Sequence, residues 1–137
     1  MRLRKASVIE TVLRTHFGDG SRSVTPLSSL QCAGGLEIAA MTGFYLAAAA
    51  HGIALICDGF ISTAAAAVAA GIEPAVREHL FAGHRSEEPG HRFLLEMLDL
   101  RPILQLDMRL GEGSGAVLAM PVLESAAAIY REMATFA

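Results

Sequence analysis

The chain is poor in aromatic residues and in charge, and it shows no strongly basic region. Aromatic residues make up 6% of its 137 residues, and tryptophan is absent. Eleven lysines and arginines stand against fourteen acidic residues, and only Arg2, Arg4 and Lys5 cluster. Because a nucleic-acid-binding surface needs a basic patch or stripe, we expect no nucleic-acid partner.

Cysteines are equally scarce, and the two present, Cys32 and Cys57, lack the close spacing of a metal site or a disulfide framework. We interpret them as reduced, buried thiols of a cytosolic protein. The basic N-terminus is followed by no apolar signal segment, since Glu10, Arg14 and His16 interrupt it. We therefore expect a cytoplasmic location.

One uncharged stretch, residues 38–57, approaches the roughly 20 residues that a membrane span needs. His51 and Gly52 divide this stretch, and half of it is alanine, glycine and threonine. The pattern predicts a buried helix, a stop at Gly52 and a buried strand, so we expect no membrane partner.

The spacing of apolar residues, and the glycines that interrupt the apolar runs, predict helices that alternate with short strands. Strands are expected at residues 53–57, 79–82 and 103–106. Helices are expected at 6–17, 36–50, 61–70, 73–78, 89–98 and 117–136, with a loop at 18–26 and a helical turn at 27–31. The 36–50 helix is apolar nearly all round, which predicts burial on most sides, and Pro121 predicts a kink or a late start in the last helix. We expect a helix-rich α/β fold with a parallel sheet, formed by residues 1–137 as a single domain.

A polar or glycine-rich segment follows each expected strand. Asp58 and Gly59 follow the first strand, residues 83–86 follow the second, and residues 107–112 follow the third. Ligands of parallel sheets bind beyond the carboxyl ends of the strands. We therefore expect Asp58, Ser86 and Glu112 to face one cleft.

Residues 109–116 read Arg-Leu-Gly-Glu-Gly-Ser-Gly-Ala and set one carboxylate between glycines just before the last helix. Glycine permits a positive φ and a close approach of backbone to ligand. The segment predicts either that Glu112 is held rigidly beside a bound molecule, or that Ser114 caps the helix and Glu112 is solvated. It is not the G-x-G-x-x-G dinucleotide fingerprint, and we expect no cofactor.

Other polar residues also leave alternatives open. Ser86 precedes an expected helix start, where it suits a phosphate cradle or a simple N-cap. Asp58 suits contact with ribose hydroxyls or a turn before Gly59. Leu110 suits an apolar slot for a flat base, or the core.

Histidines and acidic residues gather between residues 79 and 91, namely His79, His84, Glu87, Glu88 and His91. Their spacing does not match the H-E-x-x-H zinc motif, and no cysteine joins them. We therefore expect no metal site.

Four segments, taken in this order, resemble the nicotinate-nucleotide–dimethylbenzimidazole phosphoribosyltransferases, enzymes of cobalamin lower-ligand synthesis. They are residues 34–43, 58–62, 84–91 and 108–116. The resemblance runs from about Lys5 to Phe136 and concerns only the C-terminal part of a family whose members are more than twice as long.

The resemblance implies a homodimeric enzyme with a doubly wound parallel sheet and flanking helices. It implies that phosphoribosyl moves from nicotinate mononucleotide to a benzimidazole, and that Glu112, as general base, removes the benzimidazole proton. A carboxylate in an apolar pocket is a stronger base, so we expect Glu112 in such a pocket. The same resemblance implies a substrate site formed by Lys5, Asp58, Gly59, Ser86, Leu110, Gly111 and Gly113.

The upstream half of the family, with its second acidic residue, has no counterpart in this chain. Two expectations follow from that departure. The chain forms a homo-oligomer or uses a partner that supplies the missing half. Alternatively, it is a truncated, non-catalytic remnant that serves as an interaction module.

Overall fold

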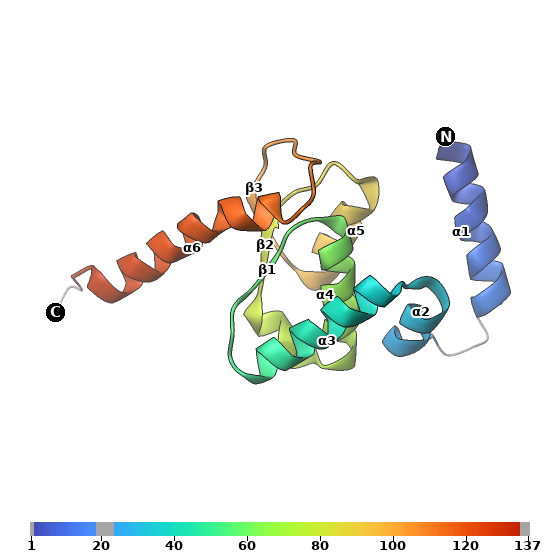
Figure 1. Ribbon diagram of the computed structural model, residues 1–137, viewed down its shortest axis with the longest axis horizontal. Coiled ribbons are helices and arrows are strands. Elements are labelled where there is room, and N and C mark those ends of the chain that lie inside the picture. The colour runs from blue at the N-terminus through green and yellow to red at the C-terminus, as the bar shows by residue number, and fades with distance from the viewer. Residues whose placement is uncertain (1, 19–23, 135–137) are drawn as a thin grey trace.

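The computed structural model describes residues 2–18 and 24–134, which fold into helices around a small sheet (Figure 1). The elements are, in order, α1 (Arg2–Phe17), α2 (Pro26–Ala33), α3 (Leu36–Ala50), β1 (Leu55–Cys57), α4 (Phe60–Ile72), the 3₁₀ helix η1 (Pro74–His79), β2 (Leu80–His84), α5 (Pro89–Leu98), β3 (Pro102–Leu104) and α6 (Ser114–Glu132).

The three strands form one parallel sheet in the order β1-β2-β3. Leu55 pairs with Leu80, and His84 pairs with Leu104. All three strands therefore end at the same edge, where ligands of such sheets bind. The expected helix-rich α/β fold with a parallel sheet is confirmed.

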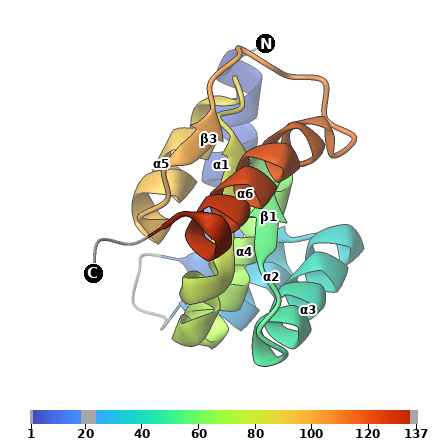
Figure 2. The same cartoon turned by 90° about the vertical axis from the view of Figure 1, so that its left-hand side faces the viewer.

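Helices cover both faces of the sheet. Figures 1 and 2 show α6 on one side of the strands and α4 with α5 on the other. Alanines 65, 66 and 69 of α4 are fully buried, and their small side chains let α3 and α5 pack closely on this central helix. In Figure 1, α1 stands away from the sheet.

Helix α3 differs from its expectation, because it is buried on one side only. Thr42, Tyr45 and Ala48 are buried, whereas Leu36 is 89% exposed and Phe44 63% exposed. The contacts of α3 with other elements are mainly with α4, and also with η1 and β1. An apolar sequence shows that a helix can be buried, but the neighbouring elements decide which side is.

Strand β2 also differs, since it continues through Gly83, where we expected it to end. A Cβ on Gly83 would lie 3.0 Å from the Cα of Ala116 and from the carbonyl oxygens of Cys57 and Gly115. This glycine therefore allows the start of α6 to approach the strand directly. In this strand, glycine marks close packing rather than a strand end.

Two helix starts were also placed wrongly. Helix α2 replaces the expected short turn, since Thr25 and Ser28 form a reciprocal capping box and Pro26 takes the first helical position. Helix α6 begins at Ser114 with Gly113 as its N-cap, so Ser114 is not the cap, and the helix runs through Pro121 rather than starting late.

Within the described ranges, no helix combines the length and the apolar character needed to cross a bilayer.

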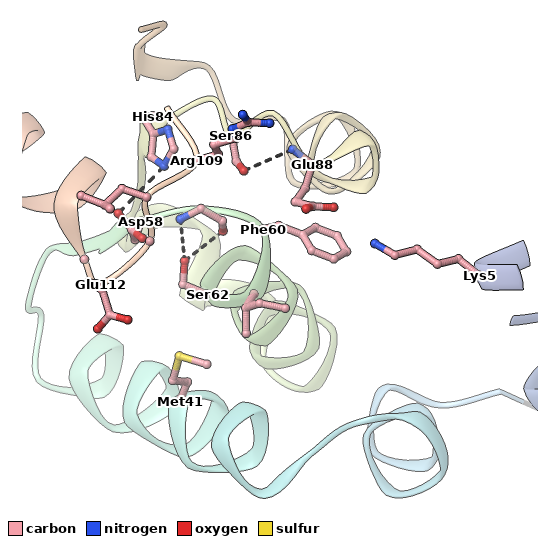
Figure 3. A pocket seen from close by; sticks show the side chains of 15 residues that line it. Lys5, Met41, Asp58, Phe60, Ser62, His84, Ser86, Glu88, Arg109 and Glu112 are labelled. Carbon is pink, nitrogen blue, oxygen red and sulfur yellow. Dashed lines mark hydrogen bonds and ion pairs between the residues drawn. The ribbon is translucent and has the colours of Figure 1, made fainter. Parts of the chain in front are cut away.

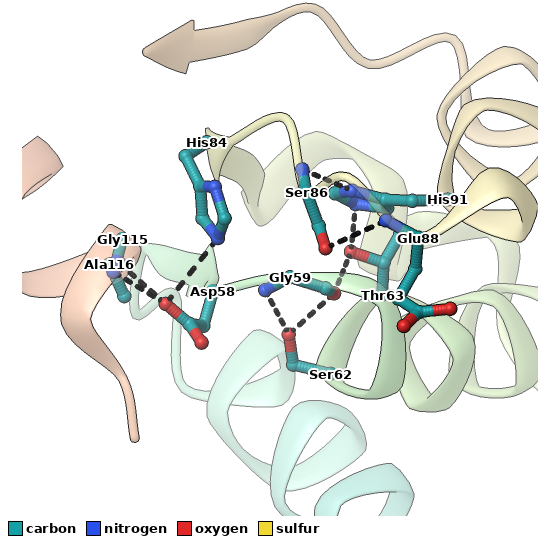
Figure 4. A network of polar contacts seen from close by, with 10 residues as sticks. All are labelled: Asp58, Gly59, Ser62, Thr63, His84, Ser86, Glu88, His91, Gly115 and Ala116. Carbon is teal, nitrogen blue, oxygen red and sulfur yellow. Dashed lines mark hydrogen bonds and ion pairs between the residues drawn. The ribbon is translucent and has the colours of Figure 1, made fainter. Parts of the chain in front are cut away.

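A buried chain of hydrogen bonds joins the segments after β1 and β2 (Figure 4). The backbone N–H of Ser86 donates to Nδ1 of the fully buried His91, at 2.9 Å. The ring proton therefore sits on Nε2, which lies 2.9 Å from the hydroxyl oxygen of Thr63. The Thr63 hydroxyl in turn donates to the carbonyl oxygen of Gly59 at 2.7 Å. A neutral His91 thus connects two strand ends.

We expect this chain of hydrogen bonds to make the free energy of unfolding depend on pH. Burial, followed by the charge of His84, lowers the pKa of His91. The unfolded chain therefore takes up the proton first as the pH falls through about 6.5. Stability should be full above that value and should fall as the pH drops toward the lowered folded pKa.

Urea unfolding at stepped pH measures this slope. His91→Gln should flatten it, because no group then titrates at that position. The exposed His51→Gln is the matched control and should leave the slope as in the original chain. An equal slope in His91→Gln would show that other groups carry the pH dependence.

Candidate functional site

A cavity of about 700 Å³ opens at the carboxyl ends of β1 and β2, below the loop that follows β3 (Figure 3). This volume is typical of sites for small organic ligands. Its lining includes all eight residues selected from the sequence, which are Lys5, Asp58, Gly59, Ser86, Leu110, Gly111, Glu112 and Gly113. Asp58, Ser86 and Glu112 therefore face one cleft, as predicted from strand order.

Asp58 follows β1 and fastens the sheet edge to α6 (Figure 4). Its Oδ1 accepts hydrogen bonds from the backbone N–H groups of Gly115 at 2.7 Å and Ala116 at 3.0 Å. First-turn N–H groups have no partner within their own helix, and negative charge is favourable beside them. Asp58 therefore caps a helix that lies 57 residues further along the chain, a role that neither sequence alternative included.

The Glu112 loop, residues 111–113, has three successive residues in the left-handed region. The φ angles are 80° at Gly111, 58° at Glu112 and 75° at Gly113. For a non-glycine residue this conformation costs about 1–2 kcal/mol, and such strain concentrates at functional sites. The turn closes with a hydrogen bond from the Ser114 N–H to the Gly111 carbonyl at 3.0 Å.

The Glu112 carboxylate does not lie in the apolar pocket that we expected. Its side chain is exposed, and it points toward the side of the cavity where Met41 of α3 lies (Figure 3). Leu110 is the neighbouring apolar side chain and is itself 77% exposed. The described residues therefore provide one wall of a pocket around Glu112 rather than an enclosure.

Ser86 lines the cavity between β2 and α5. Its Oγ accepts a hydrogen bond from the Glu88 N–H at 3.3 Å. The N-cap of α5 is Glu88, so the alternative in which Ser86 caps this helix is wrong. The backbone N–H of Ser86 donates to Nδ1 of the buried His91, and this hydrogen bond fixes the position of Ser86.

Two cationic side chains line the same cavity. Lys5 reaches toward it from α1, on the side of Phe60, and Arg109 lies near Ser86 and His84 (Figure 3). Lys5 is among the residues expected from the sequence, whereas Arg109 is not. Its position in the sequence could have indicated this role, because Arg109 is the first residue of the glycine-rich segment and directly precedes Leu110.

His84 is a second cavity residue for which the sequence predicts no role beyond its place in the polar segment after the second strand. It is the last residue of β2, is 2% exposed, and lines the cavity. Its Nε2 lies 4.0 Å from Oδ1 of Asp58. Among the described residues, no three histidine, cysteine or acidic side chains gather in a way that could hold a metal.

The cap formed by Asp58 predicts a stability effect that is specific to the N-terminus of α6. Asp58→Ala should lower the free energy of unfolding by about 1–3 kcal/mol, because two partly buried N–H groups lose a charged acceptor. Asp58→Asn keeps a carbonyl acceptor and should lose less. Urea unfolding measures both variants, and Glu124→Ala, on the exposed surface of α6, is the control. Equal stability of Asp58→Ala and Glu124→Ala would contradict the capping role.

Comparison with known proteins identifies the family. Residues 1–137 match a family model described as phosphoribosyltransferase. Nicotinate-nucleotide–dimethylbenzimidazole phosphoribosyltransferases from Xanthomonas campestris pv. campestris (strain B100) and Pseudomonas fluorescens (strain SBW25) are 53% and 51% identical over 133 residues. These alignments cover 97% of this chain and 37% of each relative.

Solved structures agree with the sequence match. A crystal structure of the enzyme of that name from Thermus thermophilus superposes with a TM-score of 0.81 at 51% identity, over 88% of this chain and 36% of that one. A crystal structure of CobT from the same organism gives 0.79 at 53% identity, over 83% and 34%. The chain thus spans little more than a third of the proteins it matches, and it belongs to the nicotinate-nucleotide–dimethylbenzimidazole phosphoribosyltransferase family.

Proposed function

We propose that this chain carries the site where phosphoribosyl moves from nicotinate mononucleotide to dimethylbenzimidazole, giving α-ribazole phosphate and nicotinate. One observation carries the proposal. The residues selected by family resemblance come from four separate stretches of sequence, and all of them line one cavity. Relatives named for this reaction share about half of the residues in this chain.

Glu112 is the general base of the proposed reaction. One benzimidazole nitrogen attacks the anomeric carbon of the ribose, and the N–H of the benzimidazole gives its proton to the Glu112 carboxylate. The bond from that carbon to the nicotinate ring nitrogen breaks, and its electron pair returns to the nitrogen. Nicotinate therefore leaves without needing a proton. The two glycines that flank Glu112 allow the loop its left-handed conformation, in which Glu112 lines the cavity.

The phosphate of the nucleotide is assigned to the Ser86 side of the cavity. Asp58 already occupies the N–H groups at the start of α6, so that helix end offers no anion site. The Ser86 hydroxyl, with Lys5 and Arg109 as cations, lines the same cavity. Lysine and arginine are the side chains that recognise phosphate in proteins.

The flat base is assigned to the apolar side of the cavity, opposite the phosphate. Met41 of α3 lies on this side, next to Glu112, and Leu110 precedes Glu112 by two residues; both line the cavity. A slot of this composition favours a planar aromatic ring and leaves the polar ring edge for the carboxylate. Gly59, which is buried against His84 and lines the cavity, has no side chain and lets the ribose approach the backbone closely.

The working enzyme, in this proposal, is a homo-oligomer or contains a partner that completes the site. The reason is surface composition, since α6 exposes Val117, Leu118, Val122, Ile129 and Tyr130. Apolar surface of this extent marks an interaction site. The same observation supports the second candidate, a non-catalytic interaction module. Both thiols, Cys32 and Cys57, are free, which fits the proposed cytoplasmic location.

Substitution of the proposed base tests the chemistry in an enzyme whose remaining two-thirds is supplied by a fused or added polypeptide. Glu112→Gln should lower kcat by roughly 10²–10⁴-fold, the usual contribution of a general base. KM for nicotinate mononucleotide should change little, since glutamine keeps the shape. Glu87→Gln, outside the cavity, is the matched control. Equal turnover of Glu112→Gln and the original enzyme across the pH range would make Glu112 structural.

The isolated chain should show little or no transferase activity. Transfer requires base, benzimidazole and nucleotide to be held at near-attack distance, and Glu112 has an open side in this chain. Benzimidazole-dependent release of nicotinate measures turnover, and light scattering measures mass. We expect association of the isolated chain, through its exposed apolar surface. Robust turnover by a monomer would overturn the need for a partner.

A further inference from the structure

We propose that His84 is a positioning residue. Its buried ring determines where the Glu112 loop lies relative to the ends of the strands. The proposal rests on the proposed function only in giving Glu112 its chemical role. His84 ends β2, and the first turn of α6 lies directly on its ring (Figure 4).

The first observation is steric. A Cβ on Gly115 would lie 2.6 Å from Cγ and 2.7 Å from Nε2 of His84, which is closer than real contacts allow. Gly115 and His84 are therefore in direct contact across the interface between α6 and β2. Gly113 and Glu112 are two and three residues before this contact, so the ring determines where the loop starts its turn.

The second observation is electrostatic. Oδ1 of Asp58, which accepts the N–H groups of Gly115 and Ala116, lies 4.0 Å from Nε2 of His84. The polar edge of the ring thus faces the same oxygen that fastens the helix. Removing the ring would free Asp58 on one side and Gly115 on the other.

The third observation is the buried Nδ1 of His84, which has no hydrogen-bond partner among the described residues. Such an atom disfavours the folded state. An apolar ring of similar size would fill the space without this disadvantage. Space filling alone therefore does not account for the imidazole, whereas the position of Nε2 beside Asp58 does.

The test uses paired substitutions in the full chain. Gly115→Ala places a methyl group against His84, and His84→Ala removes the obstacle. Hydrogen exchange of the amides of residues 115 and 116 reports the cap directly, while thermal unfolding reports global stability. Gly115→Ala should speed exchange at these amides by about 10-fold or more, and the double variant should regain protection up to the level of His84→Ala.

Gly83→Ala provides the matched control. Its Cβ would press on the backbone of Gly115, Ala116 and Cys57 rather than on the imidazole. Adding His84→Ala should therefore not restore protection in Gly83→Ala. His84→Gln keeps a donor near Asp58 and should retain more protection than His84→Ala, which keeps the test informative if the alanine variant folds poorly.

In the completed enzyme, Gly115→Ala should lower kcat by roughly 10–100-fold with little change in KM, because a misplaced catalytic group costs this much. The double variant should recover kcat only up to the level of His84→Ala, which lacks the Nε2 that faces Asp58. The proposal is overturned if the double variant exchanges as fast as Gly115→Ala, or if kcat only follows the unfolding midpoint. If Glu112→Gln leaves turnover unchanged, the proposed base is wrong, while the exchange data still decide the role of His84.

Discussion

The hydrogen bonds from Gly115 and Ala116 to Asp58 are the constraint on which the rest of the site depends. One carboxylate oxygen at the end of β1 holds the first turn of α6 against the sheet edge. Without it, two N–H groups and the positive end of a 19-residue helix would lack their acceptor. The Glu112 loop is attached to that helix, so its place relative to the strands is set by the same bond.

A second connection fixes the neighbouring strand end. The chain of hydrogen bonds from Ser86 through His91 and Thr63 to Gly59 passes through the interior and joins two residues that line the cavity. The residues assigned to base and phosphate are therefore positioned by separate buried contacts. Sites whose groups are held by such supporting bonds lose little entropy on reaching the reactive geometry.

The sequence predicted the sheet and the convergence of site residues well, because both follow from strand order. Short apolar runs followed by polar residues determine which side chains share the edge of a parallel sheet. The sequence did not predict the roles of His84 and Gly115, since contacts between β2 and α6 depend on how closely two backbones approach. For the same reason the sequence pattern predicts a strand end at Gly83, whereas this glycine allows the close approach of the two backbones.

Burial was the other property that could not be predicted from sequence. Helix α3 is apolar nearly all round, yet only the side that packs on α4, η1 and β1 is covered within the described residues. Ser114 stands where a capping residue is typical, but Asp58 supplies an acceptor from the sheet and leaves Gly113 as the N-cap. In both cases the local sequence pattern shows which roles a residue can take, burial or capping. Contacts with distant parts of the chain decide which role it has.

The site residues of this chain are held in place, but several of them are exposed to solvent. Their positions and their exposure have different physical causes. Position is set within the chain by short hydrogen bonds around Asp58 and His91. Basicity of a carboxylate and strength of charge–charge attraction depend instead on removal of water. Glu112, Leu110 and Arg109 all remain exposed in this chain. A covering surface would therefore change the chemistry of the site without rebuilding its geometry.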